Sequence, residues 1–192
     1  MVSRAPRAPA TFTRTRTSTR RAEVAPLRQG LAPVVPADAR VLVLGSFPGE
    51  ESLRQAQYYA HPRNQFWRLL GDVLRRPLAE LPYAERLARL GESRIGVWDI
   101  ITGCERVGSL DGNIRNAQLS QFEWLAGHAP DLRVVAMNGQ KAGSAARHLA
   151  ALGYTTLILP SSSPAHTLPY AQKLEGWRAL APYVRAPRPS RG

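Results

Sequence analysis

Residues 40–49 read Arg-Val-Leu-Val-Leu-Gly-Ser-Phe-Pro-Gly, an apolar run that ends abruptly in glycine and proline. A short continuous run of Val and Leu is typical of a strand that is buried on both faces of a parallel sheet. The run stops at Gly45, and a residue without a side chain lets the backbone approach a ligand closely. This stretch therefore predicts a central strand whose carboxyl end opens into a loop of functional interest.

Three more apolar runs follow the first, and segments with helical spacing separate them. Strands that alternate with helices predict a parallel sheet covered on both faces. We therefore expect an α/β fold, a three-layer α/β/α sandwich with a central four-stranded parallel sheet. In such sheets the ligand lies beyond the carboxyl ends of the strands. The further strands are expected at residues 95–101, 132–137 and 154–159, the helices at 66–74, 83–90, 119–126, 140–150 and 170–184, and the ligand-binding loops at 45–64, 99–116, 138–141 and 160–168.

The two ends of the chain differ from its middle in composition. Residues 1–30 carry seven arginines and one acid, with few large apolar groups, which predicts a disordered basic arm. An organellar transit peptide is the alternative for this segment. Residues 185–192 are expected to form a loose tail, and residues 31–184 the folded domain. The net charge is +12, but residues 31–184 carry only +3 of it. The charge is therefore weak evidence for a DNA-binding face on the domain itself.

The sequence also limits the classes of protein to consider. It contains no apolar run long enough to span a membrane, and its N-terminal segment is too polar for a secretory signal. Cys104 is the single cysteine, which excludes an internal disulfide framework and a cysteine-rich zinc site. No close cluster of His, Cys and Asp suggests a metal, and Gly-x-Gly-x-x-Gly and Walker-type loops are both missing, which disfavours a nucleotide-binding domain.

Two of the expected loops carry side chains suited to binding a nucleotide. The first holds Phe47, Tyr58 and Tyr59, whose flat rings can stack on a base, and Asn64 directly before a predicted helix. An ordinary turn with Asn64 as the helix cap fits as well. The last loop places three serines between Pro160 and Pro164, a donor-rich turn suited to a phosphate but also common on surfaces.

Taken together, the two loops resemble motifs of the uracil-DNA glycosylase superfamily. Gly45-Ser-Phe-Pro-Gly49 followed by His61-Pro-Arg-Asn-Gln-Phe-Trp67 is similar to its first motif region, most of all in the hypoxanthine-DNA (deoxyinosine) glycosylase branch. Mismatch-specific uracil-DNA glycosylases show a related pattern. Pro160-Ser-Ser-Ser-Pro-Ala-His166 is similar to the second motif, the loop that enters the DNA minor groove. The resemblance runs from about Leu31 to Tyr183 and includes residues 96–100, 108–111 and 138–141.

The chain departs from the uracil-specific branches at two places. Where the mismatch-specific branch has its water-positioning Asn, this chain has Phe47, which can stack on an extruded base but cannot orient water. The hypoxanthine branch relies instead on the Asn in the second half of the motif, which is Asn64 here. The base-reading Asn of classical uracil enzymes is not evident, and Asp99 lies in that region. The resemblance thus implies a preference for hypoxanthine.

The resemblance implies a DNA base-excision repair glycosylase that hydrolyses the N-glycosidic bond of deoxyinosine without metal or cofactor. Asn64 would position the attacking water, and Asp99 is a second candidate for water activation, or else a loop-fixing carboxylate. His166, if protonated, would stabilise negative charge. The base-binding candidates are Gly45, Ser46, Phe47, Gly49, Tyr58, Tyr59 and Asn138, and the DNA-binding candidates are Arg63, Ser161, Ser162, Ser163 and Lys173.

Two alternatives stay open. One is an enzyme of the same superfamily that acts on uracil or thymine in mismatches, or on xanthine. The other is a non-catalytic nucleic-acid-binding domain that gains its affinity from the basic arm and tail. For the glycosylase we expect DNA containing deaminated bases as the partner, no membrane, a monomer, and a cytoplasmic, nucleoid-associated location.

Overall fold

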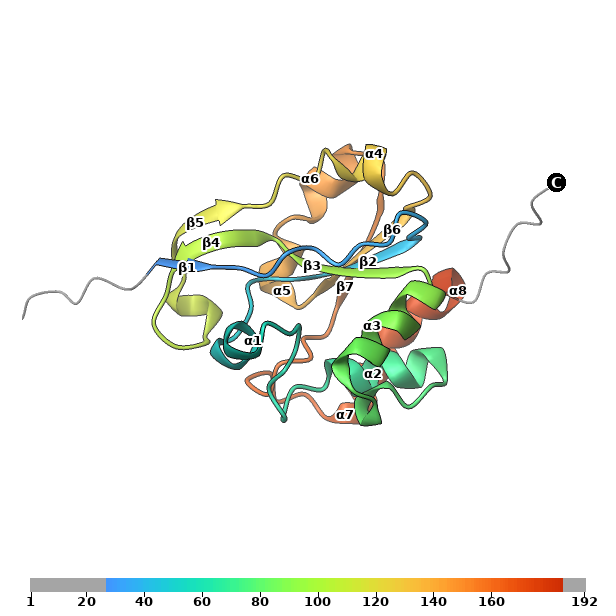
Figure 1. The fold of residues 1–192 in the computed structure, drawn as a ribbon, viewed down its shortest axis with the longest axis horizontal. Helices are drawn as coiled ribbons and strands as arrows, with labels where there is room; N and C mark the ends of the chain where they lie inside the picture. Colours follow the sequence, from blue (N-terminus) through green and yellow to red (C-terminus); the bar gives the residue numbers. More distant parts are fainter. Residues whose placement is uncertain (1–26, 185–192) are drawn as a thin grey trace, which may run out of the picture.

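The computed structural model describes residues 27–184, and a parallel sheet forms its centre (Figure 1). Its strand order is β3-β2-β6-β7, and every neighbouring pair is parallel. The predicted four-stranded sheet is therefore confirmed, and each strand overlaps the range expected for it. The strands are β2 (Val41–Gly45), β3 (Ile95–Asp99), β6 (Val134–Asn138) and β7 (Thr155–Leu159).

Helices cover both faces of this sheet, as predicted (Figure 1). Successive residues of β2 point to opposite faces, so Leu42 and Leu44 join one apolar core while Val41 and Val43 join the other. None of the helices within residues 27–184 has the length and apolar character needed to cross a membrane. The Val41 face packs against α2 (Phe66–Leu74), α3 (Tyr83–Glu92), α7 (Tyr170–Trp177) and α8 (Ala181–Val184), and the Leu42 face against α4 (Leu125–His128), α5 (Gln140–Gly143) and α6 (Ala146–Ala151).

A second, antiparallel sheet departs from the predictions. Its order is β1-β4-β5, formed by β1 (Leu27–Gln29), β4 (Ile101–Glu105) and β5 (Arg115–Leu119). The strand expected at 95–101 ends at Asp99, because the chain turns at Ile100 into this sheet. The helix predicted at residues 119–126 is wrong, since Leu119 ends β5 and only α4 is helical there.

The boundary of the predicted basic arm is also wrong. Residues 27–29 form β1, whose backbone pairs with β4. The remainder of the expected arm, residues 1–26, and the expected tail, residues 185–192, lie outside the described residues.

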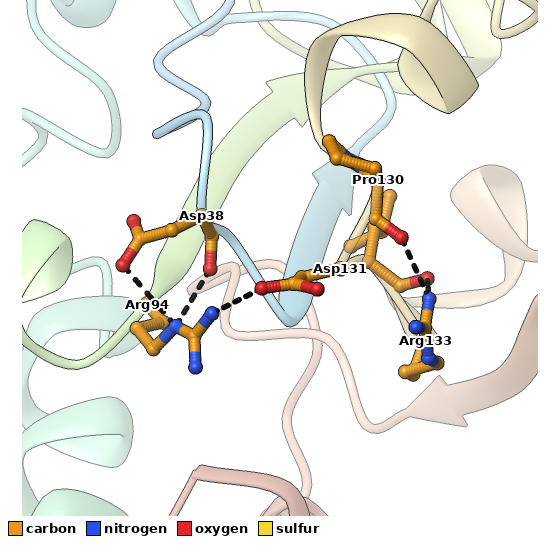
Figure 2. Close-up of polar contacts among 6 residues, drawn as sticks. Asp38, Arg94, Pro130, Asp131 and Arg133 are labelled. Carbon is orange, nitrogen blue, oxygen red and sulfur yellow. Dashed lines mark hydrogen bonds and ion pairs between the residues drawn. The ribbon is translucent and has the colours of Figure 1, made fainter. Parts of the chain in front are cut away.

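Arg94 ties together the loops at the amino ends of the central strands (Figure 2). Its guanidinium donates to the Asp38 backbone carbonyl at 2.7 Å and pairs with the carboxylates of Asp38 and Asp131. Arg133 donates to the Pro130 carbonyl at 2.8 Å in the same region. Because Asp38, Arg94 and Asp131 precede β2, β3 and β6, this network fixes one end of the sheet and leaves the carboxyl ends of the strands to form the site.

Candidate active site

A cavity of about 820 Å³ lies at the carboxyl ends of the parallel strands. This volume falls in the range of small-molecule and cofactor pockets and is large enough for a nucleobase. Its walls come from the loops that the strand pattern predicted, and the loop expected at residues 99–116 contributes Asp99 and residues between β4 and β5. They comprise residues 45–49, 51–52, 58–59, 61, 63–64, 99, 109–113, 138 and 161–166.

Asp99 forms part of the buried floor of this cavity. It is the last residue of β3 and only 4% exposed, and its Oδ2 has no hydrogen-bond partner among the described residues. Burial, and secondarily the negative charge of Asp111, raises the pKa of the Asp99 carboxyl to about 8, against an opposing effect of Arg106. At neutral pH the carboxyl is therefore mostly protonated, so that it can both donate and accept a hydrogen bond.

Tyr59 supplies a second unpartnered polar atom at the floor. Its buried hydroxyl has no hydrogen-bond partner within residues 27–184, and its ring stacks on Phe66 with the centroids 3.7 Å apart. Burial, and then the charge of Asp99, raises the pKa of the Tyr59 hydroxyl far above its ordinary value, against an opposing effect of the nearby Asn138 side chain, so the hydroxyl stays protonated. Tyr59 adopts a left-handed backbone conformation, φ 55°, which is uncommon for a residue other than glycine.

Tyr58, predicted as a base-stacking residue, lines the cavity, but its hydroxyl is engaged in packing. Its side chain is buried, and its hydroxyl donates to the backbone carbonyls of Leu31 and Ala32, the latter at 3.0 Å. The carbonyl of Tyr58 also accepts from the indole of Trp67 at 3.1 Å. Of the two adjacent tyrosines, only Tyr59 therefore offers the cavity a free polar group.

Asn64 lies on the wall of the cavity at the start of α2. Its Oδ1 accepts a hydrogen bond from the Phe66 backbone N–H at 2.9 Å, but the N-cap of α2 is Gln65, so this bond closes a turn directly before the helix and Asn64 is not its cap. The bond uses one of two lone pairs on Oδ1, and Nδ2 has no partner in the described part of the chain. The turn thus holds a half-buried carboxamide in place and leaves it free to bind water. His61 Nδ1 accepts from the Arg63 backbone N–H at 3.1 Å and fixes the same loop, while Arg63 itself is exposed.

Phe47 presents an aromatic ring to the cavity, and a buried arginine lies over that ring. The Arg106 guanidinium carbon is 4.7 Å from the ring centroid, and Arg106 donates to the Pro48 carbonyl at 2.5 Å. Such a contact holds an aromatic ring by charge as well as by packing. The sequence analysis missed Arg106, because only its burial distinguishes it from the many exposed arginines.

The loop after β7 that carries Ser161, Ser162 and Ser163, called the serine loop below, is held by hydrogen bonds inside the protein. Ser162 is fully buried, its N–H donates to Asn138 Oδ1 and its hydroxyl accepts from Asn138 Nδ2, both at 2.8 Å. The Gln65 N–H donates to the Ser162 carbonyl at 3.0 Å. Ser162, predicted as a DNA contact, thus joins the loop to β6 and α2 through its own hydrogen bonds. Ser161, Ser163 and the exposed His166 line the cavity.

Lys173 also differs from its predicted role. It is 1% exposed, and its ammonium donates to the Ser163 backbone carbonyl at 3.3 Å. Burial lowers the pKa of its ammonium. In this position Lys173 supports the serine loop from inside the protein, and its buried ammonium cannot reach a DNA phosphate at the surface.

The loop between β4 and β5 forms another wall and lies beside α1 (Glu50–Gln55) (Figure 1). Ser46 donates to Asp111 Oδ1 at 2.6 Å, and the Glu50 backbone N–H donates to Ser109 Oγ at 2.9 Å. These bonds join the first loop, at Ser46 and Glu50, to the loop that was expected at residues 99–116, although Ser109 and Asp111 were not named as site residues.

Comparison with known proteins agrees with this arrangement. The family model for the uracil DNA glycosylase superfamily matches residues 32–183. A hypoxanthine DNA glycosylase of Methanosarcina barkeri (strain Fusaro / DSM 804) is 41% identical over 150 residues, 78% of this chain and 95% of the relative. One from Methanosarcina acetivorans is 36% identical over 154 residues, 80% of this chain and 98% of the relative. A solution NMR structure from M. acetivorans, provisionally assigned as a uracil DNA glycosylase, superposes with a TM-score of 0.77 at 35% identity over 83% of this chain and 99% of that one. The chain belongs to the uracil-DNA glycosylase superfamily.

Proposed function

We propose that the protein is a DNA base-excision repair glycosylase that removes hypoxanthine from deoxyinosine and leaves an abasic site. The observation that carries this proposal is the cavity at the strand ends, whose buried floor holds the unpartnered polar atoms of Asp99 and Tyr59 and whose wall holds Asn64. The relatives named hypoxanthine DNA glycosylase, which align with about four fifths of the chain, support this choice of base.

The floor suits the polar edge of an extruded hypoxanthine. That base carries an N–H donor next to a carbonyl acceptor, and a protonated carboxyl carries a complementary acceptor and donor. Asp99, which burial keeps mostly neutral at pH 7, can form this pair, whereas an ionised Asp99 would repel the base carbonyl. The Tyr59 hydroxyl offers a further donor, and Phe47 offers a flat face for the ring.

Asn64 is the residue that we assign to the attacking water. Its carboxamide cannot accept a proton, so it orients the water through the free lone pair of Oδ1 and through Nδ2. The bond from the sugar C1′ to the base breaks with its electron pair on the base, the water oxygen bonds to C1′, and the water proton ends on the released base. Asp99 is protonated and therefore a poor acceptor for that proton, which favours a role as donor to the departing base.

No single residue suffices for this reaction. Enzymes lower barriers by roughly 8–23 kcal/mol, and one well-placed donor contributes about 3–4 kcal/mol. Extrusion of the base from the stack also has a cost, which is smaller for a weakened pair such as deoxyinosine with thymine. The proposal therefore requires Asp99, Tyr59 and Asn64 to act together.

The rim of the cavity is suited to hold the DNA strand. Arg63 and His166 are exposed there, and the hydroxyls of Ser161 and Ser163 lie beside them. Such groups position a phosphate backbone without reading sequence. We extend the proposal to a monomer that acts on DNA in the cytoplasm, in association with the nucleoid.

The direct test is single-turnover excision from a duplex with one deoxyinosine, in which alkali cleaves the abasic site. Asn64→Ala removes both the turn bond to the Phe66 N–H and the water-binding amide, whereas Asn64→Ser retains a hydroxyl oxygen that can accept from that N–H. We expect both variants to lose about 100-fold or more in rate, with a stability loss of about 1 kcal/mol only in Asn64→Ala. Tight DNA binding by the wild type without excision would instead support a non-catalytic binding domain.

A further inference from the structure

Arg106 is a buried arginine whose guanidinium keeps most of its hydrogen-bonding capacity unused. The side chain is 1% exposed. Its Nη2 donates to the Pro48 carbonyl, but Nε and Nη1 have no hydrogen-bond partner in the described part of the chain. Burial of a charged group without its full set of hydrogen bonds is unfavourable, so a group in this state requires an explanation.

The acidic groups around Arg106 are bound to other partners. Asp111 Oδ1 accepts from a serine hydroxyl at 2.6 Å, and the Glu50 carboxylate pairs with Arg28 at 3.8 Å. Burial lowers the pKa of the Arg106 guanidinium, Cys104, Asp111 and Glu50 oppose this effect, and Arg28 adds to it. Because an arginine stays charged in proteins, Arg106 holds a positive charge that no direct ionic contact within residues 27–184 neutralises.

This charge lies over the ring of Phe47, which lines the cavity. The guanidinium carbon is 4.7 Å from the ring centroid, and Arg106 itself does not line the cavity. Because the guanidinium covers one face of the ring, a base in the cavity can stack only on the other face. A cation on one face also draws the ring electrons toward itself and makes the opposite face less negative. Phe47 therefore offers the base a surface that favours added electron density.

The cations at the rim of the cavity cannot replace this charge. Arg63 and His166 are exposed, so water and salt weaken their effect on the base. A buried charge acts through a medium of lower effective dielectric, and its effect extends farther. As the glycosidic bond breaks, the base gains negative charge, and a fixed positive charge nearby stabilises this state more than the neutral ground state.

From these observations we infer that Arg106 is a positioning residue for base excision, which keeps a positive charge behind the Phe47 ring and thereby stabilises the negative charge that develops on the departing hypoxanthine. This inference rests on the proposed function. Arg106 touches neither the base nor the water, and it acts through Phe47. Its charge therefore matters for bond cleavage and has little effect on binding of the intact, neutral base.

The pH dependence of excision gives a readout that a purely structural role would not move. Burial and the charge of Asp111 raise the pKa of the Asp99 carboxyl, and Arg106 opposes this rise. Without the charge of Arg106, the fall in excision rate with rising pH should shift to higher pH in Arg106→Met. It should stay in place in Arg106→Lys, which retains the charge. The same pH dependence in the wild type and both variants overturns the inference.

The main test compares the rate of excision with the affinity for uncleaved DNA. Arg106→Met removes the charge, Arg106→Gln removes it but keeps an N–H donor for the Pro48 carbonyl, and Arg106→Lys retains both. Single-turnover excision of deoxyinosine should slow by about tenfold or more in the two neutral variants and by about threefold or less in Arg106→Lys. Affinity for a duplex with 2′-fluorodeoxyinosine, whose fluorine blocks bond cleavage, should stay within about twofold of the wild type in all three.

Arg86→Met is the matched control. The Arg86 guanidinium carbon lies 5.3 Å from the centroid of the Trp67 ring, and Arg86 donates to the backbone carbonyls of Leu81 and Ala79, but neither Arg86 nor Trp67 lines the cavity. This variant should excise at the wild-type rate. Unchanged excision in the neutral variants, equal slowing in Arg106→Lys or in Arg86→Met, or a loss of affinity as large as the loss of rate overturns the inference. A wild type that excises nothing contradicts the proposed function instead.

Discussion

Gly45 and Asp99 lie side by side at the ends of β2 and β3, and the missing side chain of one makes room for the carboxyl group of the other. A Cβ atom on Gly45 would overlap Asp99 Oδ1 and lie 3.0 Å from the Tyr59 hydroxyl oxygen. The glycine that ends the first apolar run is therefore what allows two polar side chains to meet at the floor of the cavity.

Gly45→Ala should thus damage the floor. We expect about 100-fold slower excision and a stability loss of about 1–3 kcal/mol, because a methyl group would displace buried groups that have little room to move. Gly49→Ala is the matched control, since its Cβ would meet only Ser109, with Oγ at 3.5 Å, an ordinary contact. Single-turnover rates and urea denaturation measure both effects. Equal excision rates and equal stabilities of the two variants would show that the floor tolerates a methyl group at Gly45.

Excision should depend on the protonation of Asp99. Its pKa of about 8 and its assigned role as a donor predict that the rate falls as pH rises through about 8. Asp99→Asn cannot ionise and retains a donor and an acceptor, so it should be slower but flat across the same range. The pH profile of single-turnover excision distinguishes the roles: a wild-type rate that rises through pH 8 would make Asp99 a base that accepts the water proton.

Folding stability should show the same titration with a definite sign. Folding raises the pKa of the Asp99 carboxyl from its ordinary value of 3.8 to about 8, so between these values the unfolded chain binds fewer protons than the native one. The free energy of unfolding therefore declines as pH rises from about 4 to about 8, by a few kcal/mol from this group. In urea denaturation at both pH values, Asp99→Asn should remove most of the decline and be more stable than the wild type at pH 8. The same pH slope in both proteins would rule out Asp99 as its source.

The two adjacent tyrosines should respond oppositely to loss of the hydroxyl. Tyr59→Phe removes an unpartnered buried group, so it should leave stability unchanged or slightly higher while excision slows by about tenfold or more. Tyr58→Phe removes a hydroxyl bonded to two backbone carbonyls, so it should cost about 1 kcal/mol and leave the rate near the wild type. Thermal melts and single-turnover rates on both variants test this. The reverse pattern would show that the Tyr58 hydroxyl serves excision and the Tyr59 hydroxyl serves stability.

The dependence of DNA affinity on salt concentration should distinguish Arg63, which we expect to contact a phosphate, from Lys173, which is buried. Arg63→Ala, at an exposed rim position, should reduce the slope of log affinity against log salt by about 1. Lys173→Met should leave that slope unchanged and lower stability, because its ammonium holds the Ser163 carbonyl inside the protein. A reduced slope for Lys173→Met would show that Lys173 contacts a DNA phosphate.

The central sheet was predictable because each of its strands is a short apolar run between helices. The second sheet was not, for two physical reasons. Residues 115–119 are fully exposed and mostly polar, so β5 carries no apolar pattern. β4 follows β3 after only Ile100, so the two strands looked like one run.

The position of the site followed from the strand ends, but the roles of individual residues did not. Tyr58 and Tyr59 are chemically identical neighbours that both line the cavity, and they differ in the hydrogen bonds that the fold gives to their hydroxyls. Lys173 belongs to a residue type that is expected at the surface, yet the fold buries it. Such distinctions depend on burial and partners that arise only in three dimensions.

The preference for hypoxanthine over uracil can be tested by one comparison. Single-turnover excision is measured on two duplexes of the same sequence, one with deoxyinosine paired with thymine and one with uracil paired with guanine. The account predicts rapid excision of hypoxanthine, lost in Asn64→Ser, and much slower release of uracil. Faster excision of uracil than of hypoxanthine would contradict this prediction, because Phe47 and the protonated Asp99 would then belong to an enzyme that prefers uracil.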